Sequence, residues 1–385
     1  MSTLYLHVGT PKTGTSAIQA FLAIPENQSV LDSHGFAYPL FKEKYDLTGD
    51  DAVPQRNAHP LIYGQYLNQG KYNEYTEMRE NFYNDVRELL DSGKNVILSD
   101  ESVWHVSRKI DSFYKNIYDR IKGYGHDMKV IVYLRRQDDF IQSYWRYKVQ
   151  VPRRHMQMSF NQYINSKKYE YFPLDYHAQL THIADAIGGK ENLIVRAYER
   201  SQFRGTPPNI IEDFLINIGL ELTDEYQDPD IQRNPGLDYI CCEVKRRLNR
   251  YPELQSNNII RRFMNDITEE NSEQGLYKVD TLFTKKKGEA FMSQYNESNA
   301  QTAIDFMDRP DGKLFYSKPT FEDKEITKFT PNDYMDICFR IMKKLDDENA
   351  VLRQELKKTK GELKVANQKF GNRVINKVKG NNKKK

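Results

Sequence analysis

The sequence has few cysteines and no long apolar run. It contains three cysteines in 385 residues, and Cys241 and Cys242 are adjacent, so the thiols do not make a disulfide framework. No stretch approaches the roughly 20 apolar residues that a membrane-spanning helix needs, and we find no internal repeat and no Cys/His cluster of the zinc type. The chain enters its first expected strand at once, so we expect no signal peptide. These absences favour a soluble protein of the reducing cytoplasm.

Charge is unevenly distributed along the chain. Residues 353–385 carry 12 Lys and Arg but 2 Asp and Glu, whereas the 352 residues before them carry 45 and 52. The mildly acidic body argues against nucleic-acid binding, and we expect no nucleic-acid partner for it. The basic tail suits peripheral contact with anionic lipid at the inner membrane, with an acidic polymer or with RNA.

The strongest local pattern lies between Thr3 and Leu22. Leu4–Val8 is short, apolar and rich in strand formers, and Ser16–Leu22 has apolar residues at helical spacing. The loop between them, Gly9–Ser16, contains two glycines, a proline, one lysine and four hydroxyl residues. Such a loop points free backbone N–H groups at whatever lies above the helix start, where the helix dipole adds positive potential. We therefore expect a phosphate or sulfate ligand here; the alternative is an ordinary strand-to-helix turn.

This loop differs from a nucleoside-triphosphate loop at one position. Gly9 and Gly14 have the spacing of GxxxxGK[ST], but the next residue is Thr15, and the lysine, Lys12, lies inside the loop. The change indicates a different phosphate geometry and no metal ion. The loop instead resembles the phosphosulfate-binding loop of sulfotransferases that use 3′-phosphoadenylyl sulfate (PAPS), whose pattern is Pro-Lys-[Ser/Thr]-Gly-Thr-[Ser/Thr]. The matching residues are Pro11, Lys12, Thr13, Gly14, Thr15 and Ser16.

Two further strand-then-loop units follow. Val96–Leu98 has the pattern of a buried strand and is followed by Glu101, whereas Met128–Leu134, the clearest strand of the chain, runs into Arg135. Ligands of open α/β sheets lie beyond the carboxyl ends of the strands. We therefore expect Glu101 and Arg135 on the same edge of the sheet as Lys12.

The second of these strands is expected to lead into a helix over Phe140–Val151, with Asp138 or Asp139 as its N-cap. The resemblance to PAPS sulfotransferases continues at this point. In that family, an arginine after the strand and a serine eight positions later hold the 3′-phosphate of the nucleotide. The resemblance therefore implies this role for Arg135 and Ser143, which have that spacing.

Neighbouring residues leave alternatives. Arg136 is a second candidate for the phosphate ligand, although the spacing favours Arg135. Gln137 stands where many family members have a proline, so we expect this loop to be less rigid. Arg204 and Gly205 fall in a region that contacts the 3′-phosphate in relatives, which implies a further contact to the nucleotide.

The general base is indicated less sharply. The resemblance implies a glutamate or a histidine near the strand that ends before Glu101, and Glu101 is preferred because a carboxylate near Lys12 is held ionised. Asp100, His59 and His105 are the alternatives, and His59 lies in an Asn-x-His segment that faces the acceptor site in relatives. Glu101 is also open to a structural role, as a helix-start carboxylate that interacts with the helix dipole. We expect Lys12 to stabilise the leaving phosphate.

The order of elements, together with the resemblance, implies an α/β fold of the P-loop type. This fold is a three-layer sandwich with a central parallel sheet flanked by helices, here followed by a long C-terminal helix. We expect a sulfotransferase domain over residues 1–340, with helical insertions that shape the acceptor site at about 40–80 and 226–330. Residues 341–371 have leucines at mixed seven- and four-residue steps, which is typical of an amphipathic helix or of a weak coiled coil that joins copies in a homo-oligomer. We expect the basic residues 372–385 to be disordered.

These features predict an enzyme that transfers a sulfuryl group in line from PAPS to a hydroxyl of a carbohydrate acceptor, a polysaccharide or a glycolipid. Adenosine 3′,5′-bisphosphate (PAP) is the expected product. The basic and aromatic residues over 152–180 suit a sugar chain or an anionic acceptor, with a solvated face as the alternative. Two other functions stay open: a P-loop kinase or nucleotidase, and a non-catalytic nucleotide-binding scaffold.

Overall fold

The computed structural model describes residues 1–41, 44–45, 55–64, 72–151, 155–228, 236–323 and 329–381, with side chains up to residue 370. The chain divides into two units. The first contains residues 1–148, 158–234 and 280–326, and the second contains residues 149–157, 235–279 and 327–385. The region over 226–330, for which we predicted one helical insertion, is thus shared between the two units.

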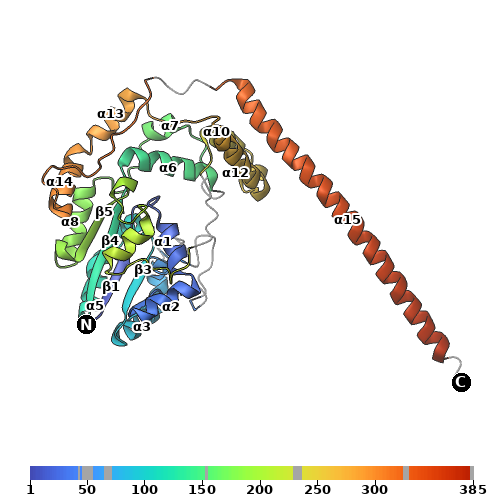
Figure 1. The fold of residues 1–385 in the computed structure, drawn as a ribbon, viewed down its shortest axis with the longest axis horizontal. Helices are drawn as coiled ribbons and strands as arrows, with labels where there is room; N and C mark the ends of the chain where they lie inside the picture. Colours follow the sequence, from blue (N-terminus) through green and yellow to red (C-terminus); the bar gives the residue numbers. More distant parts are fainter. Residues whose placement is uncertain are drawn as a thin grey trace. The chain divides into compact units, whose positions relative to one another are not determined.

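A parallel β-sheet forms the centre of the first unit. Within the described residues it has five strands in the order β2-β3-β1-β4-β5, and every neighbouring pair runs parallel (Figure 1). The strands are β1 (Thr3–His7), β2 (Phe36–Ala37), β3 (Asn95–Ser99), β4 (Asp127–Leu134) and β5 (Leu193–Ala197). The predicted α/β class with a central parallel sheet is confirmed.

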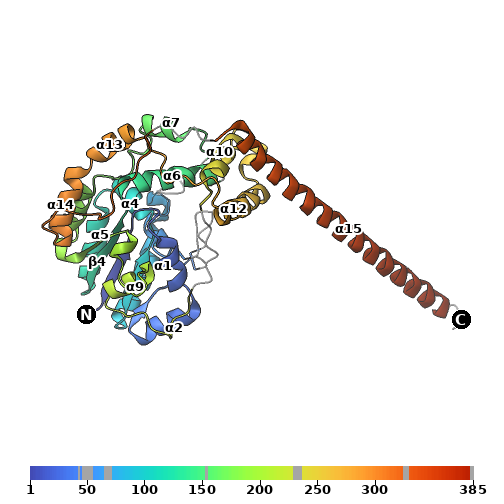
Figure 2. The same ribbon diagram turned by 45° about the horizontal axis from the view of Figure 1, so that its top comes forward.

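Helices cover both faces of this sheet. The helices on one face are α1 (Thr15–Leu22), α2 (Pro25–Ser33) and α9 (Ile210–Asn217), which lie next to one another in Figure 2. The helices on the other face are α3 (Thr76–Asp91), α5 (Phe113–Gly123) and α8 (Tyr176–Ala186). Ile97 of β3 packs against the helices of the first face, α1, α2 and α9. Val96 and Leu98 pack in the apolar cluster of the opposite face, with α3, α5 and α8. Side chains that alternate across the strand are therefore buried on both sides, which explains the unbroken apolar run.

The remaining α-helices described in the first unit include one whose start differs from the prediction. These helices are α4 (Val103–Val106), α6 (Gln137–Gln150), α7 (Phe160–Asn165), α13 (Lys285–Ser293) and α14 (Asn296–Met307). Because α6 already begins at Gln137, Asp138 and Asp139 lie in its first turn and neither is the N-cap. Carboxylates in a first turn also interact favourably with the helix dipole. The two aspartates therefore do mark the start of a helix, but the helix begins before them and not after them.

The predicted insertion at about 40–80 is described in part, because residues 42–43, 46–54 and 65–71 lie outside the described residues. The other residues of this region contain two short 3-10 helices, η1 (His59–Leu61) and η2 (Tyr72–Tyr75), and the first turn of α3. η1 carries His59 and belongs to the site discussed below.

The second unit is helical in its described part. Its helices are α10 (Tyr239–Leu248), α11 (Pro252–Gln255), α12 (Asn258–Glu273) and α15 (Pro331–Asn381). We predicted a helix over 341–371 and disorder over 372–385, but α15 begins ten residues earlier and continues to Asn381. Proline is favourable at a first helical position, and the Lys, Arg, Gln and Glu residues that follow are good helix formers. None of the helices in the described ranges is both long and apolar enough to cross a bilayer.

Candidate functional site

The carboxyl ends of three neighbouring strands carry the predicted site residues. β1 lies between β3 and β4, so the loops that follow these strands emerge side by side. Lys12 follows β1, Glu101 follows β3 and Arg135 follows β4. This edge is where open α/β sheets bind their ligands.

The loop after β1 is fastened to β4. The N–H and the hydroxyl of Thr10 both donate to the carbonyl oxygen of Tyr133, at 3.0 and 3.1 Å. Lys12 and Gly14 have positive φ angles of 69° and 74°, and Gly14 is the N-cap of α1. A Cβ at Gly14 would lie 3.2 Å from the ring of Tyr198. Glycine therefore permits both the left-handed backbone and the close approach of this ring.

The hydroxyl residues of the loop divide into two groups. Thr13 and Thr15 are buried, and Thr13 Oγ1 donates to the carbonyl of Thr10 at 2.6 Å. The Thr13 hydroxyl is thus hydrogen-bonded inside the loop, and its expected role in holding the ligand stays a prediction. Ser16 is exposed, and among the described residues no acceptor lies against the N–H groups of Gly14, Thr15 or Ser16. These N–H groups at the start of α1 are available to an anion.

A buried polar network that the sequence did not indicate supports this loop. His7, at the end of β1, has its Nδ1 atom 2.9 Å from the hydroxyl of Ser99, and its Nε2 atom lies 3.2 Å from where a Cβ of Gly9 would be. Burial lowers the pKa of His7 to about 3, so the ring is neutral. Gln19 of α1 donates to Ser99 Oγ at 3.2 Å and to Glu101 Oε2 at 3.4 Å. The network thus joins β1 and α1 to the loop after β3.

Glu101 is held by two side chains. Arg56 Nη2 lies 2.6 Å from Glu101 Oε1, and 15% and 13% of the two side chains are exposed. The N-cap of the following helix, α4, is Ser102. The carboxylate of Glu101 contacts Arg56 and Gln19. These contacts do not favour the alternative role of Glu101, in which its carboxylate interacts with the dipole of the following helix.

Two of the alternative bases form a buried pair. His59 Nδ1 and Asp100 Oδ2 lie 2.7 Å apart, and 1% and 0% of their side chains are exposed. Burial raises the pKa of Asp100, but the hydrogen bond and charge of His59, the charge of Arg56 and the N–H of Ser102 outweigh it, so this pKa is lowered. An ionised and enclosed Asp100 orients the His59 ring.

Asn57 explains why this pair forms beside β3. Its side-chain amide donates to the carbonyl of Ile97 at 2.9 Å and accepts from the N–H of Ser99 at 2.7 Å. The amide thus continues the hydrogen-bonding edge of β3 like a short extra strand. This attachment brings η1, and with it His59, against the loop that follows β3.

The two arginines after β4 have different partners. Arg135 Nη1 donates to the carbonyl oxygen of Lys12 at 2.7 Å, so the loop after β4 directly contacts the loop after β1. Arg136 makes two hydrogen bonds to the carboxylate of Asp138, at 2.6 and 3.0 Å, and a third to Ser317 Oγ at 2.8 Å. Arg136 is therefore held by the buried carboxylate of Asp138 and by the exposed Ser317. The geometry favours Arg135 as the anion ligand, as the spacing did.

The ammonium of Lys12 lies among groups of both signs. It is 5.2 Å from the ring centroid of Tyr147, which stands one turn after Ser143 on α6. Burial and the positive charge of Arg135 lower the pKa of Lys12, and the carboxylate of Glu101 opposes this shift. Two cations beside free N–H groups suit a highly charged anion, and the carboxylate adds a proton acceptor. Arg56, Tyr147 and Tyr198 are members of this edge that we did not predict as site residues.

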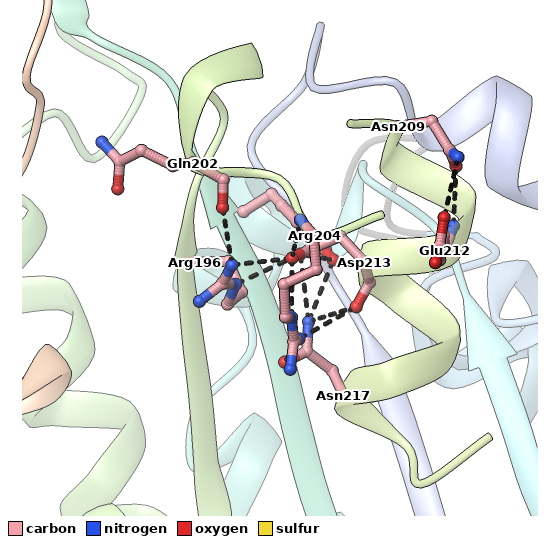
Figure 3. Close-up of polar contacts among 8 residues, drawn as sticks. Arg196, Gln202, Arg204, Asn209, Glu212, Asp213 and Asn217 are labelled. Atoms are coloured by element: carbon pink, nitrogen blue, oxygen red, sulfur yellow. Dashed lines mark hydrogen bonds and ion pairs between the residues drawn. The ribbon is translucent and has the colours of Figure 1, made fainter. Parts of the chain in front are cut away.

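Arg204 belongs to a different cluster (Figure 3). Arg204 Nε and Arg196 Nη2 donate to the carboxylate of Asp213 at 3.0 and 2.6 Å. The hydroxyl of Tyr133 also donates to this carboxylate, at 2.7 Å. Burial raises the pKa of Asp213, but the hydrogen bonds of Arg196, Tyr133 and Arg204 outweigh it and lower this pKa. The guanidinium of Arg204 thus neutralises a buried carboxylate that ties α9 to the sheet, and its expected contact with the nucleotide stays a prediction.

Two other residues named in the sequence analysis, Gln137 and His105, have defined side-chain contacts. Gln137 and Asn299 exchange two side-chain hydrogen bonds of 2.7 and 3.0 Å, so an amide pair links the position where many family members have proline to α14. His105 packs edge-on against Phe172, with 5.0 Å between ring centroids, and against Tyr171. Its ring is part of an aromatic cluster.

The fold defines an α/β protein with a central parallel sheet, and the comparisons with known proteins add a distant likeness. An "uncharacterized protein" of Archaeoglobus fulgidus is 31% identical over 171 residues, which are 44% of this chain and 44% of that protein. The chain thus spans less than half the length of the relative that it matches. No family model matches the chain, and no solved structure matches it.

Proposed function

We propose that this protein is a sulfotransferase that moves a sulfuryl group from PAPS to a hydroxyl of a carbohydrate. The observation that carries the proposal is the hydrogen bond of Arg135 to the carbonyl of Lys12. It brings the two segments that resemble nucleotide-binding segments of PAPS sulfotransferases into contact at neighbouring strand ends. Assignment of the fold to the P-loop type is part of the same proposal.

The donor is bound by groups from two loops. Lys12 and the backbone N–H groups of Gly14, Thr15 and Ser16 hold the 5′-phosphosulfate, with the exposed Ser16 hydroxyl beside them. Arg135 and Ser143 hold the 3′-phosphate. The nucleotide thereby lies across the ends of β1 and β4, and no metal ion takes part.

The transfer needs one proton acceptor and one stabilised leaving group. The acceptor oxygen attacks sulfur, the bond between sulfur and the 5′-phosphate oxygen breaks, and the hydroxyl proton passes to Glu101. Lys12 neutralises the charge that develops on the departing PAP. Glu101 is preferred to His59 and Asp100 because those two side chains are enclosed, whereas Glu101 retains exposed surface.

The cellular setting is part of this proposal. We place the enzyme in the cytoplasm, with the basic tail in peripheral contact with anionic lipid of the inner membrane, where polysaccharide and glycolipid acceptors are made. The body of the protein is expected to have no nucleic-acid partner.

The decisive test is incubation of the protein with PAPS that carries labelled sulfate and a panel of glycans, followed by mass spectrometry of the product. Lys12→Met should abolish transfer, and Lys115→Met is the matched control because Lys115 pairs with Asp119 on the exposed face of α5. Binding of PAP without transfer to any glycan would favour a scaffold. Binding of ATP with magnesium in place of PAP would favour a kinase or nucleotidase.

A further inference from the structure

α15 carries an apolar stripe that none of the described residues covers. Its first part packs against α10 and α12, where Ile337 and Ile341 are buried and Arg340 and Lys344 bind Glu270 at 2.6 and 2.8 Å. From residue 349 to residue 370, every side chain is exposed. A helix that is polar on one side and apolar on the other is normally stabilised by packing of its apolar face.

The exposed stripe follows a heptad repeat. The a positions are Met342, Asn349, Leu356, Leu363 and Phe370, and the d positions are Leu345, Leu352, Thr359 and Ala366. The exposed fractions of Met342, Leu352, Leu356, Leu363 and Phe370 are 62%, 52%, 54%, 60% and 71%. Four consecutive heptads with this pattern have the length and the seam of a two-stranded coiled coil.

The polar residues of the repeat select one partner and one orientation. Asn349 occupies an a position, where a single asparagine favours a parallel dimer in register. Glu355 at g and Lys360 at e are five residues apart, so they do not meet on one helix. In a parallel dimer, each g residue faces the e residue of the next heptad on the partner, which pairs Glu355 with Lys360. An antiparallel pair would instead place g beside g and e beside e, and like charges would meet.

We propose that α15 forms a parallel, in-register coiled coil with a second copy of this chain, from Met342 to Phe370. The interface goes beyond the proposed catalytic function, because it joins two copies of the chain, each of which has its own site. Three features support this dimer: the heptad pattern, the asparagine at an a position, and the complementary charges at the g and e positions.

The first experiment measures the mass of the full chain by analytical ultracentrifugation across a concentration series. The wild type should reach about twice the monomer mass of 45.4 kDa. Leu356→Glu with Leu363→Glu, at a positions, should weaken dimerisation at least about a thousandfold. Val351→Glu with Val365→Glu is the matched control: these residues are 54% and 49% exposed at c positions, outside the seam, and the dimer should persist. A monomeric wild type, or equal loss in both variants, overturns the proposal.

The second experiment tests orientation. Glu355→Lys should weaken the dimer roughly fivefold, and adding Lys360→Glu should restore it. Thr359→Cys at a d position, in a Cys338→Ser background, should form an intermolecular disulfide readily in the parallel dimer. Absence of both rescue and cross-linking, or a mass above that of a dimer, overturns the parallel two-stranded arrangement.

Discussion

Alanine substitution of the adjacent arginines Arg135 and Arg136 should change different properties: nucleotide binding for Arg135 and stability for Arg136. Arg135 donates to the carbonyl of Lys12 at the exposed edge, whereas Arg136 neutralises Asp138, whose side chain is 1% exposed. In the proposed function, removing Arg135 deletes charge-assisted hydrogen bonds to the 3′-phosphate, which are worth about 1.5–3 kcal/mol, so PAP should bind roughly 10–150-fold more weakly. The fold loses little, because one hydrogen bond to a partly exposed carbonyl contributes about 1 kcal/mol.

Arg136→Ala should act on stability instead. It leaves the carboxylate of Asp138 buried without its bidentate partner, a loss that costs about 3–5 kcal/mol in comparable pairs. For a unit of this size, 3 kcal/mol lowers the Tm by roughly 6–12 °C. Thermal denaturation and calorimetric titration with PAP separate the two effects at a temperature where both variants are folded. Tight PAP binding by Arg135→Ala, or an unchanged Tm for Arg136→Ala, would refute the division of roles.

Three further predictions concern single positions. Glu101→Gln should lower the rate of sulfuryl transfer about 10²–10⁴-fold with PAP affinity nearly unchanged, measured by product formation and titration; an unchanged rate would move the base elsewhere. Gly14→Ala should destabilise the loop by about 1–2 kcal/mol, because φ is 74° and the new Cβ meets Tyr198 at 3.2 Å, and PAP should bind more weakly; an unaffected Kd would contradict the role of this turn. Asp213→Asn should lower the free energy of unfolding at pH 7. Because the folded pKa of Asp213 is lowered, its stabilising contribution is present above the unfolded pKa of about 3.9 and is lost as pH falls, so urea denaturation of wild type and variant should converge below pH 4. A constant difference down to pH 3 would argue against ionisation as the cause.

The local parts of the fold and site could be predicted from the sequence. The strand, loop and helix around Lys12 follow from apolar runs and helical spacing, and β4 with Arg135 follows from the largely apolar run Met128–Leu134, one residue shorter than the observed strand. Each signal lies within one short segment, where periodicity and loop composition decide the backbone. The same reasoning ordered Glu101, Lys12 and Arg135 along one edge of the sheet.

What could not be predicted depends on residues far apart in the chain. Asn57 binds the edge of β3 across 42 positions, and His7 meets Ser99 across 92 positions. No local pattern distinguishes an asparagine that completes a sheet edge from one in an ordinary loop. The same limit applies to Thr13 and Arg204, since a hydroxyl or guanidinium that suits a phosphate equally suits a carbonyl or a buried carboxylate.

Calorimetric titration of the full chain with PAP in the presence of EDTA tests the central claim most directly. The account predicts saturable binding at one site per chain, unaffected by removal of metal ions, and at least about tenfold weaker binding of adenosine 5′-phosphate, which lacks the phosphate held by Arg135. Absence of PAP binding, or equal affinity for the two nucleotides, would contradict it.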